Sequence, residues 1–91
     1  MLSEKICIGQ VVENTSGRDT GRLFFVVKAI DDQYVLISDG KKRKLDKPKL
    51  KKVKHLKTYN IINNKVKNMV ESKESITDTF LRVELGKLNN V

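Results

Sequence analysis

The chain is poor in cysteine, histidine and aromatic residues, and each scarcity excludes a class of protein. Its 91 residues include one cysteine, Cys7, so no internal disulfide can form, as is typical of proteins in a reducing cytoplasm. One histidine, His55, and one distant cysteine fall short of the four ligands of a structural zinc site. We therefore expect no metal and no cofactor, and we interpret Cys7 as a small packing residue of a strand.

Long hydrophobic runs are also lacking. The longest uninterrupted apolar stretch, residues 23–27, has five residues, whereas a membrane span needs about 20. Residues 1–5 precede an interrupted apolar stretch and not the continuous apolar region of a signal peptide. We expect a cytoplasmic protein that does not cross a membrane.

No pattern of catalytic residues stands out. Acidic residues lie mostly in predicted turns and on predicted helix surfaces, without paired carboxylates, a nucleophile beside a base, or a glycine-rich phosphate loop. A chain of 91 residues forms one small domain with little room for a large substrate cleft. The expectation is a protein that is not an enzyme and has no small-molecule substrate.

Positive charge, in contrast, is abundant and concentrated. Residues 41–57, KKRKLDKPKLKKVKHLK, hold ten of the 19 lysines and arginines and a single acid, Asp46, which makes this segment +9. Residues 1–40 carry −2 and residues 58–91 carry +1, so nearly all of the net charge of +8 lies in one place. A solvated face that aids solubility is the alternative, but solubility rarely needs so dense a charge. The segment predicts contact with a polyanion, because each lysine that neutralises a phosphate releases a counterion.

The first 40 residues have the alternation of a β structure. Residues 6–13, 22–30 and 34–38 are rich in β-branched and apolar residues, and turn residues separate them. In the second stretch apolar side chains occur on both faces, with Phe25 on one face and Phe24 on the other. This pattern favours a tightly curved sheet or barrel, with the C-terminal segment as the candidate cover for its outer face.

The basic segment is predicted to continue the sheet. Asp39-Gly40 has the composition of a hairpin turn that starts a further strand. Pro48 lacks an N–H and separates two short predicted strands, residues 41–45 and 51–56. We expect an ordered segment and not a disordered tail, because four apolar residues recur in it as anchors to the sheet: Leu45, Leu50, Val53 and Leu56.

Beyond residue 57 the apolar period changes to that of a helix. Tyr59, Ile62 and Val66 recur at helical spacing, and a second amphipathic pattern ends at Gly86. Residues 1–57 are therefore predicted as a β-barrel with a basic strand region at 41–57, and residues 58–91 as a helical extension packed on it. The two helices either cover the barrel or present a groove to a protein partner.

The residues around the first turn carry a resemblance to a known family. Residues 9–12 (GQVV), 16–21 (SGRDTG) and 23–30 form a strand, a glycine-bounded turn and a second strand. This pattern resembles the KOW motif, with Gly21 at the position of its characteristic glycine. The N-terminal half is similar to KOW-bearing large-subunit ribosomal proteins of archaea and eukaryotes and to small bacterial KOW proteins. The resemblance implies a small SH3-like barrel of five strands that contacts ribosomal RNA through this turn and nearby basic residues.

The turn itself supplies candidate site residues. Its glycines allow a tight turn and the close approach of another backbone, and Arg18 at the tip can place its guanidinium on a phosphate. A plain hairpin turn with a solvated arginine is the alternative. The candidate residues of the turn are Gly17, Asp19, Thr20 and Gly21.

Aromatic residues offer few platforms for stacking on bases. Phe24, Phe25 and Tyr34 lie in predicted strands and are expected in the core. Tyr59, flanked by Lys57 and His55, is the best of the stacking candidates, but packing within a helix is the favoured interpretation.

The charge pattern predicts a non-catalytic protein that contacts backbone phosphates, and the KOW resemblance implies that the partner is structured RNA, most naturally ribosomal RNA. Lysine far outnumbers arginine in the basic segment, which favours phosphate contacts over base-specific readout. A protein-interaction module of the transcription or translation machinery is the alternative, whereas attachment to anionic membranes lacks a basic amphipathic helix. The predicted phosphate contacts are Arg18, Lys41, Lys42, Arg43, Lys44, Lys47, Lys49, Lys51, Lys52, Lys54 and Lys57.

Overall fold

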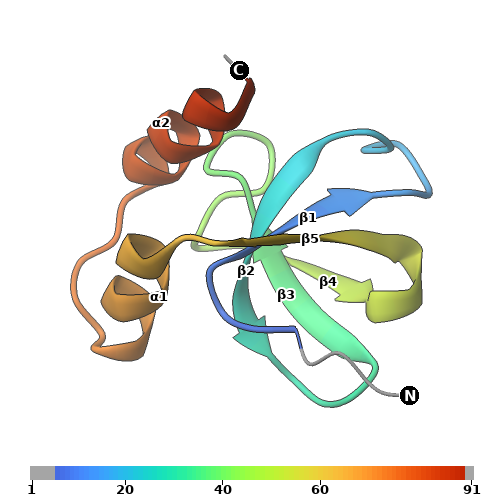
Figure 1. Cartoon of the computed structure of the whole chain (residues 1–91), viewed down its shortest axis with the longest axis horizontal. Helices are drawn as coiled ribbons and strands as arrows, with labels where there is room; N and C mark the ends of the chain where they lie inside the picture. The colour runs from blue at the N-terminus through green and yellow to red at the C-terminus, as the bar shows by residue number, and fades with distance from the viewer. Residues whose placement is uncertain (1–5, 90–91) are drawn as a thin grey trace.

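Five antiparallel strands followed by two helices make up the chain in the computed structural model, which describes residues 6–89 (Figure 1). Residues 1–5 and 90–91, which the predicted ranges 1–57 and 58–91 include, lie outside the described residues, as does most of the stretch used to judge a signal peptide. The elements are β1 Gln10–Asn14, β2 Leu23–Ala29, β3 Tyr34–Ser38, β4 Lys49–Lys52, the 3-10 turn Val53–His55, β5 Leu56–Ile62, α1 Asn64–Glu71 and α2 Asp78–Asn89.

The sheet has the strand order β4-β3-β2-β1-β5, with every neighbouring pair antiparallel. A mainly β domain with C-terminal helices is therefore confirmed. The closed barrel is wrong, because the edge strands β4 and β5 do not pair with each other in the sheet. Closure requires a hydrogen-bonded ladder between the first and last strands, whereas β4 has only four residues and passes through a 3-10 turn into β5.

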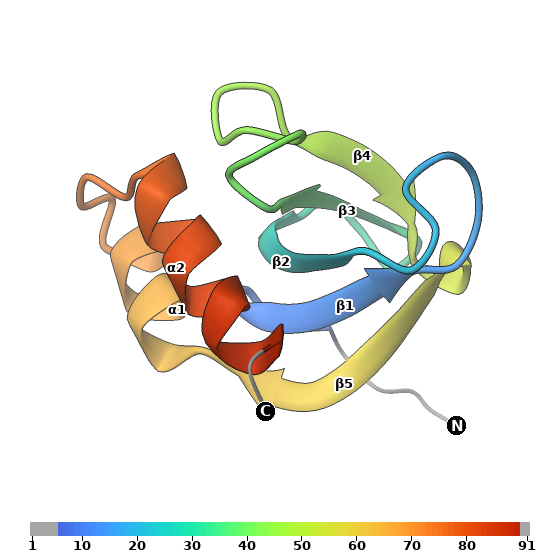
Figure 2. The same cartoon turned by 90° about the horizontal axis from the view of Figure 1, so that it is seen from above.

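Both faces of the curved sheet are apolar, as predicted, and each has its own core. One face lies on the inner side of the curved sheet and buries Val12, Phe24 and Ile37. The other buries Val11 and Phe25 beneath the two helices (Figure 2). The helices contribute three buried residues to this second core, Val66, Leu81 and Leu85, so their apolar stripes cover the sheet.

The prediction of a strand over residues 41–45 is wrong. Residues 39–48 form a loop, because the buried Asp39 carboxylate accepts hydrogen bonds from the backbone N–H groups of Lys41 and Arg43, both at 2.9 Å. The Ser38 hydroxyl donates to the Arg43 carbonyl at 2.6 Å and closes the loop further. Such local bonds compete with an extended ladder. Three of the four predicted anchors, Leu45, Val53 and Leu56, pack against the two cores, while Leu50 is 53% exposed.

The helical pattern predicted from Tyr59 begins only at Asn64. Tyr59 and Ile62 belong to β5, because the free edge of β1 offers a ladder for residues 56–62 that outweighs the local helical period. The helix α1 then starts where the Asn63 side chain accepts a hydrogen bond from the Val66 N–H at 3.1 Å. Strand β5 thus crosses the boundary expected after residue 57. The predicted end at Gly86 is also wrong, since α2 continues through it to Asn89.

Candidate nucleic-acid interface

The turn between β1 and β2, residues 15–22, is built by its own hydrogen bonds. Gly17 and Gly21 have φ values of +84° and +88°, a region that favours glycine. The Thr20 hydroxyl donates to the Gly17 carbonyl at 2.6 Å, and Arg18 at the tip is exposed. A side chain at Gly21 would meet no atom within 4 Å, so its role is to permit the turn and not a close backbone approach.

The loop 39–48 is tied to one side of this turn by an ion pair. The buried carboxylate of Asp19 accepts from Arg43 Nε and pairs with Arg43 Nη2, both at 3.0 Å to the same oxygen. Asp19 therefore positions the basic loop. The guanidinium of Arg43 is committed to this contact and is half-buried.

The other side of the turn contacts the second half of the basic segment. Thr15 donates to the His55 carbonyl through its backbone N–H at 3.0 Å and through its hydroxyl at 2.7 Å. Lys51 Nζ donates to the Ser16 carbonyl at 3.4 Å. The structure thus brings together the two regions that the sequence singled out, because residues 41–57 contact the turn on both sides.

Most of the predicted phosphate contacts have exposed side chains. Lys51 and Lys52 are half-buried, and the Lys52 ammonium lies 5.7 Å from the centre of the Tyr34 ring. In the ladder Lys51 opposes Val35 and Lys49 opposes Ile37. Both lysines therefore lie at the edge of the sheet, on its inner face. The exposed candidates are Arg18, Lys41, Lys42, Lys44, Lys47, Lys49, Lys54 and Lys57.

The phenylalanines and Tyr59 serve the core, whereas Tyr34, which was also expected there, is half-buried and belongs to neither core. Phe24 and Phe25 are fully buried, as predicted, and Tyr59 is half-buried against the helix-covered core. The Tyr59 hydroxyl donates to the Glu13 carboxylate; this hydrogen bond, together with desolvation, raises the pKa of Tyr59 above its ordinary value of 10.0. Packing of Tyr59 is therefore confirmed, although in a strand and not in a helix.

Two arginines outside residues 41–57 join the basic surface and were missed by sequence reasoning. Arg22, the last residue of the turn, forms an ion pair of 3.5 Å with Asp39. Arg82 of α2 donates from Nη1 to the Gly40 carbonyl at 2.6 Å. Arg22 directly follows a candidate glycine, whereas nothing in the sequence pattern points to Arg82.

Other kinds of site were sought in the described residues. Within residues 6–89 no group of three or more His, Cys, Asp or Glu residues could hold a metal ion. None of the helices described is long and apolar enough to cross a membrane.

Comparison with known proteins adds one relative. No protein-family model matches the chain. The chain is similar to the curated protein "Putative ribosome-binding protein YbzG" of Bacillus subtilis (strain 168), with 32% identity over 73 residues. The alignment covers 80% of this chain and 99% of that protein, so the similarity is not confined to one short motif.

Proposed function

Because the chain belongs to the family of Bacillus subtilis YbzG, we propose that it is a ribosome-associated protein that binds structured ribosomal RNA without catalysis. The relative's name, which describes it as ribosome-binding, supports the ribosome as the partner. The concentrated charge supports RNA as the component that is bound. A protein with this partner works in the cytoplasm.

One observation carries the proposal: the most basic segment of the chain packs around the glycine-bounded turn. The Asp19–Arg43 pair and the Thr15–His55 hydrogen bonds hold residues 41–57 on both sides of that turn. Buried Asp19 and Asp39 are paired with arginines, so the exposed lysines face solvent without nearby compensation from these two acids. This surface suits a polyanion that presents phosphates along a curved path.

The mode of recognition follows from the residue types. Lysine ammonium groups act as point charges on phosphates, and base reading needs planar groups with fixed donors. With Arg43 held by Asp19, lysines and Arg18 supply the free charge. We therefore propose recognition of RNA shape and backbone, with weak dependence on sequence.

The KOW resemblance enters the same proposal. The unit β1–turn–β2 has the strand, the positive-φ glycines and the second strand of that motif, and the turn is the part that the resemblance assigns to RNA contact. We propose that this turn acts as a KOW-type contact on a curved, open sheet.

Removal of exposed lysines tests the proposal. The triple variant Lys42→Gln, Lys44→Gln and Lys49→Gln removes three charges from exposed side chains of the basic segment. Titrations against Bacillus subtilis ribosomes over a salt series should show weaker binding, and the slope of log K against log salt should fall by about 0.7–0.9 for each phosphate that the variant no longer neutralises.

A matched control removes the same charge elsewhere. The triple variant Lys28→Gln, Lys65→Gln and Lys73→Gln also changes three exposed lysines, all outside residues 41–57. Its binding should stay near that of the wild type. Equal losses in the two variants would mean that only net charge matters, and a salt-independent affinity would refute phosphate recognition.

A further inference from the structure

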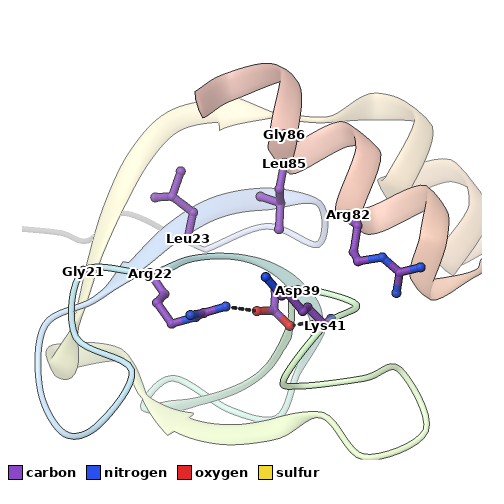
Figure 3. Close-up of a pocket in the computed structure, with 8 residues that line it drawn as sticks. All are labelled: Gly21, Arg22, Leu23, Asp39, Lys41, Arg82, Leu85 and Gly86. Atoms are coloured by element: carbon purple, nitrogen blue, oxygen red, sulfur yellow. Dashed lines mark hydrogen bonds and ion pairs between the residues drawn. The ribbon is translucent and has the colours of Figure 1, made fainter. Parts of the chain in front are cut away.

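A pocket of about 480 Å³ opens between the end of the turn, the start of the loop 39–48 and helix α2 (Figure 3). Its cationic lining comes from Arg22, Lys41 and Arg82, and its apolar lining comes from Leu23 and Leu85. Figure 3 shows the two leucines on one side of the pocket, with Arg22 and Lys41 on the other. The volume lies within the range of about 300–1,000 Å³ that is typical of small-ligand sites.

The pocket is positively charged. Three cationic side chains and one carboxylate, Asp39, give its lining a net charge of +2. Asp39 is already engaged, because it accepts from two backbone N–H groups and pairs with Arg22. An anionic group that enters therefore meets an excess of positive charge.

Arg22 is poorly satisfied within the protein. Its distance of 3.5 Å to Asp39 is longer than the about 2.7–2.9 Å of a strong charge-assisted hydrogen bond. Its Nε is buried and, among the described residues, has no hydrogen-bond partner. Arg43, in contrast, makes two contacts of 3.0 Å with Asp19. Arg43 serves the fold, whereas the guanidinium of Arg22, on a side chain that is 33% exposed, lines the pocket with a longer ion pair.

Arg82 is held at the rim by the protein. Its Nη1 donates to the Gly40 carbonyl at 2.6 Å and its Nη2 to the Thr79 hydroxyl at 2.9 Å. A guanidinium carries five N–H donors, so these two bonds fix its position and leave donors free. Such a preset group binds a phosphate at a low cost in side-chain entropy.

Gly86 has no structural reason to be glycine. It lies inside α2, where glycine weakens a helix, and its φ is not positive. A Cβ placed there would meet no atom within 4 Å, so packing does not require glycine either. The absence of a side chain at Gly86 leaves the pocket open.

We propose that this pocket receives one unstacked nucleotide of the bound RNA. Its phosphate lies against Arg22 and Arg82, and its base or sugar lies against Leu23 and Leu85. Bases in loops and bulges are splayed out in this way when proteins recognise RNA. The inference rests on the proposed function and adds to it a feature of RNA structure that the lysines alone cannot select.

The test uses two RNA hairpins that differ by one bulged nucleotide. The wild-type protein should bind the bulged hairpin about tenfold more tightly, as stacking or packing of one base allows. Gly86→Leu fills the pocket and should abolish this preference while the affinity for the fully paired hairpin is unchanged. Arg82→Gln should also reduce the preference, and thermal unfolding of both variants verifies that they are folded.

The outcomes separate the two proposals. The lysine triple variant should weaken binding to both hairpins equally. Wild-type protein that binds both hairpins with the same affinity would overturn the nucleotide pocket and leave RNA binding intact. If the wild-type protein bound neither hairpin and did not bind ribosomes, both the proposed function and the nucleotide pocket would be overturned.

A free nucleotide would present the same phosphate, sugar and base to the pocket. Titration with 5′-AMP and with inorganic phosphate, followed by the amide resonance of Gly86, distinguishes it from RNA. The expected result is weak binding of both, well below the affinity for the bulged hairpin. Tight binding of 5′-AMP without any preference for the bulge would assign the pocket to a free nucleotide and overturn the inference.

Discussion

The helix-covered core and the basic surface formed by the turn 15–22 and the loop 39–48 are held together by different forces. The first is an apolar layer in which Leu81 and Val66 are fully buried against Phe25. The second is ordered by two buried carboxylates: Asp39 accepts from two backbone N–H groups and pairs with Arg22, and Asp19 pairs with Arg43. The difference shows how a small domain keeps a surface dense in lysine ordered: the acids lie beneath it, where they cancel little of its exposed charge.

The largest expected effect comes from a substitution in the helix-covered core. Leu81→Ala removes a fully buried side chain and should lower the free energy of unfolding by about 2–5 kcal/mol. Urea denaturation measures the change. Val83→Ala on the same helix is the control, because Val83 is 51% exposed and its replacement should change stability by less than about 0.5 kcal/mol. Equal effects would show that the helix does not pack as described.

A smaller effect is expected from a substitution beneath the basic surface. Asp39→Ala leaves two loop N–H groups and Arg22 without their acceptor, and we expect a loss of about 1–3 kcal/mol in unfolding free energy. RNA affinity should fall as well, although the variant gains positive charge, because the loop loses its order. Asp46→Ala adds the same charge at an exposed position and should bind at least as tightly as the wild type. Tighter RNA binding by Asp39→Ala would show that loop order is irrelevant.

The smallest effect concerns pH. Hydrogen bonds from Lys87 and Asn63 lower the pKa of Glu84 below its ordinary value of 4.5. A carboxylate with a lowered pKa stabilises the fold above its unfolded pKa and loses this contribution as pH falls through the folded pKa. The contribution should be about 0.2–1 kcal/mol, since Lys87 is largely exposed.

Denaturation of the wild type and of Glu84→Gln from pH 7 to pH 3 measures this contribution. The stability difference between them should be present near neutral pH and shrink in the acid range. A difference that stays constant across the series would contradict the role of the ionised carboxylate.

Much of the fold was readable in the sequence because local patterns agreed with the tertiary environment. The strands β2 and β3 follow apolar and β-branched runs, and apolar residues on both faces of β2 correctly indicated a covered, curved sheet. The turn 15–22 was recognisable because Gly17 and Gly21 adopt the positive φ that glycine allows. The role of the basic segment in RNA binding stays a prediction.

The errors arose where hydrogen bonds formed in the folded protein outweighed the predicted pattern. Residues 41–45 were predicted as a strand because they follow the Asp39-Gly40 turn, but the Asp39 carboxylate folds them into a loop. Tyr59 and Ile62 have helical spacing, but the open edge of β1 draws them into β5. The burial of the Asp39 carboxylate and the position of the β1 edge follow from the tertiary structure, and a short window of sequence does not specify them.

The sequence by itself determined where the charge lies, the order of β before α, and the glycine-bounded turn, because each depends on composition or on near neighbours. Only the tertiary structure decided that the sheet remains open, that Asp19 holds Arg43, and that Arg22 and Arg82 line one pocket with Gly86. These features depend on contacts between residues far apart in the chain. Burial of the two apolar faces fixes those contacts, and no local preference specifies them.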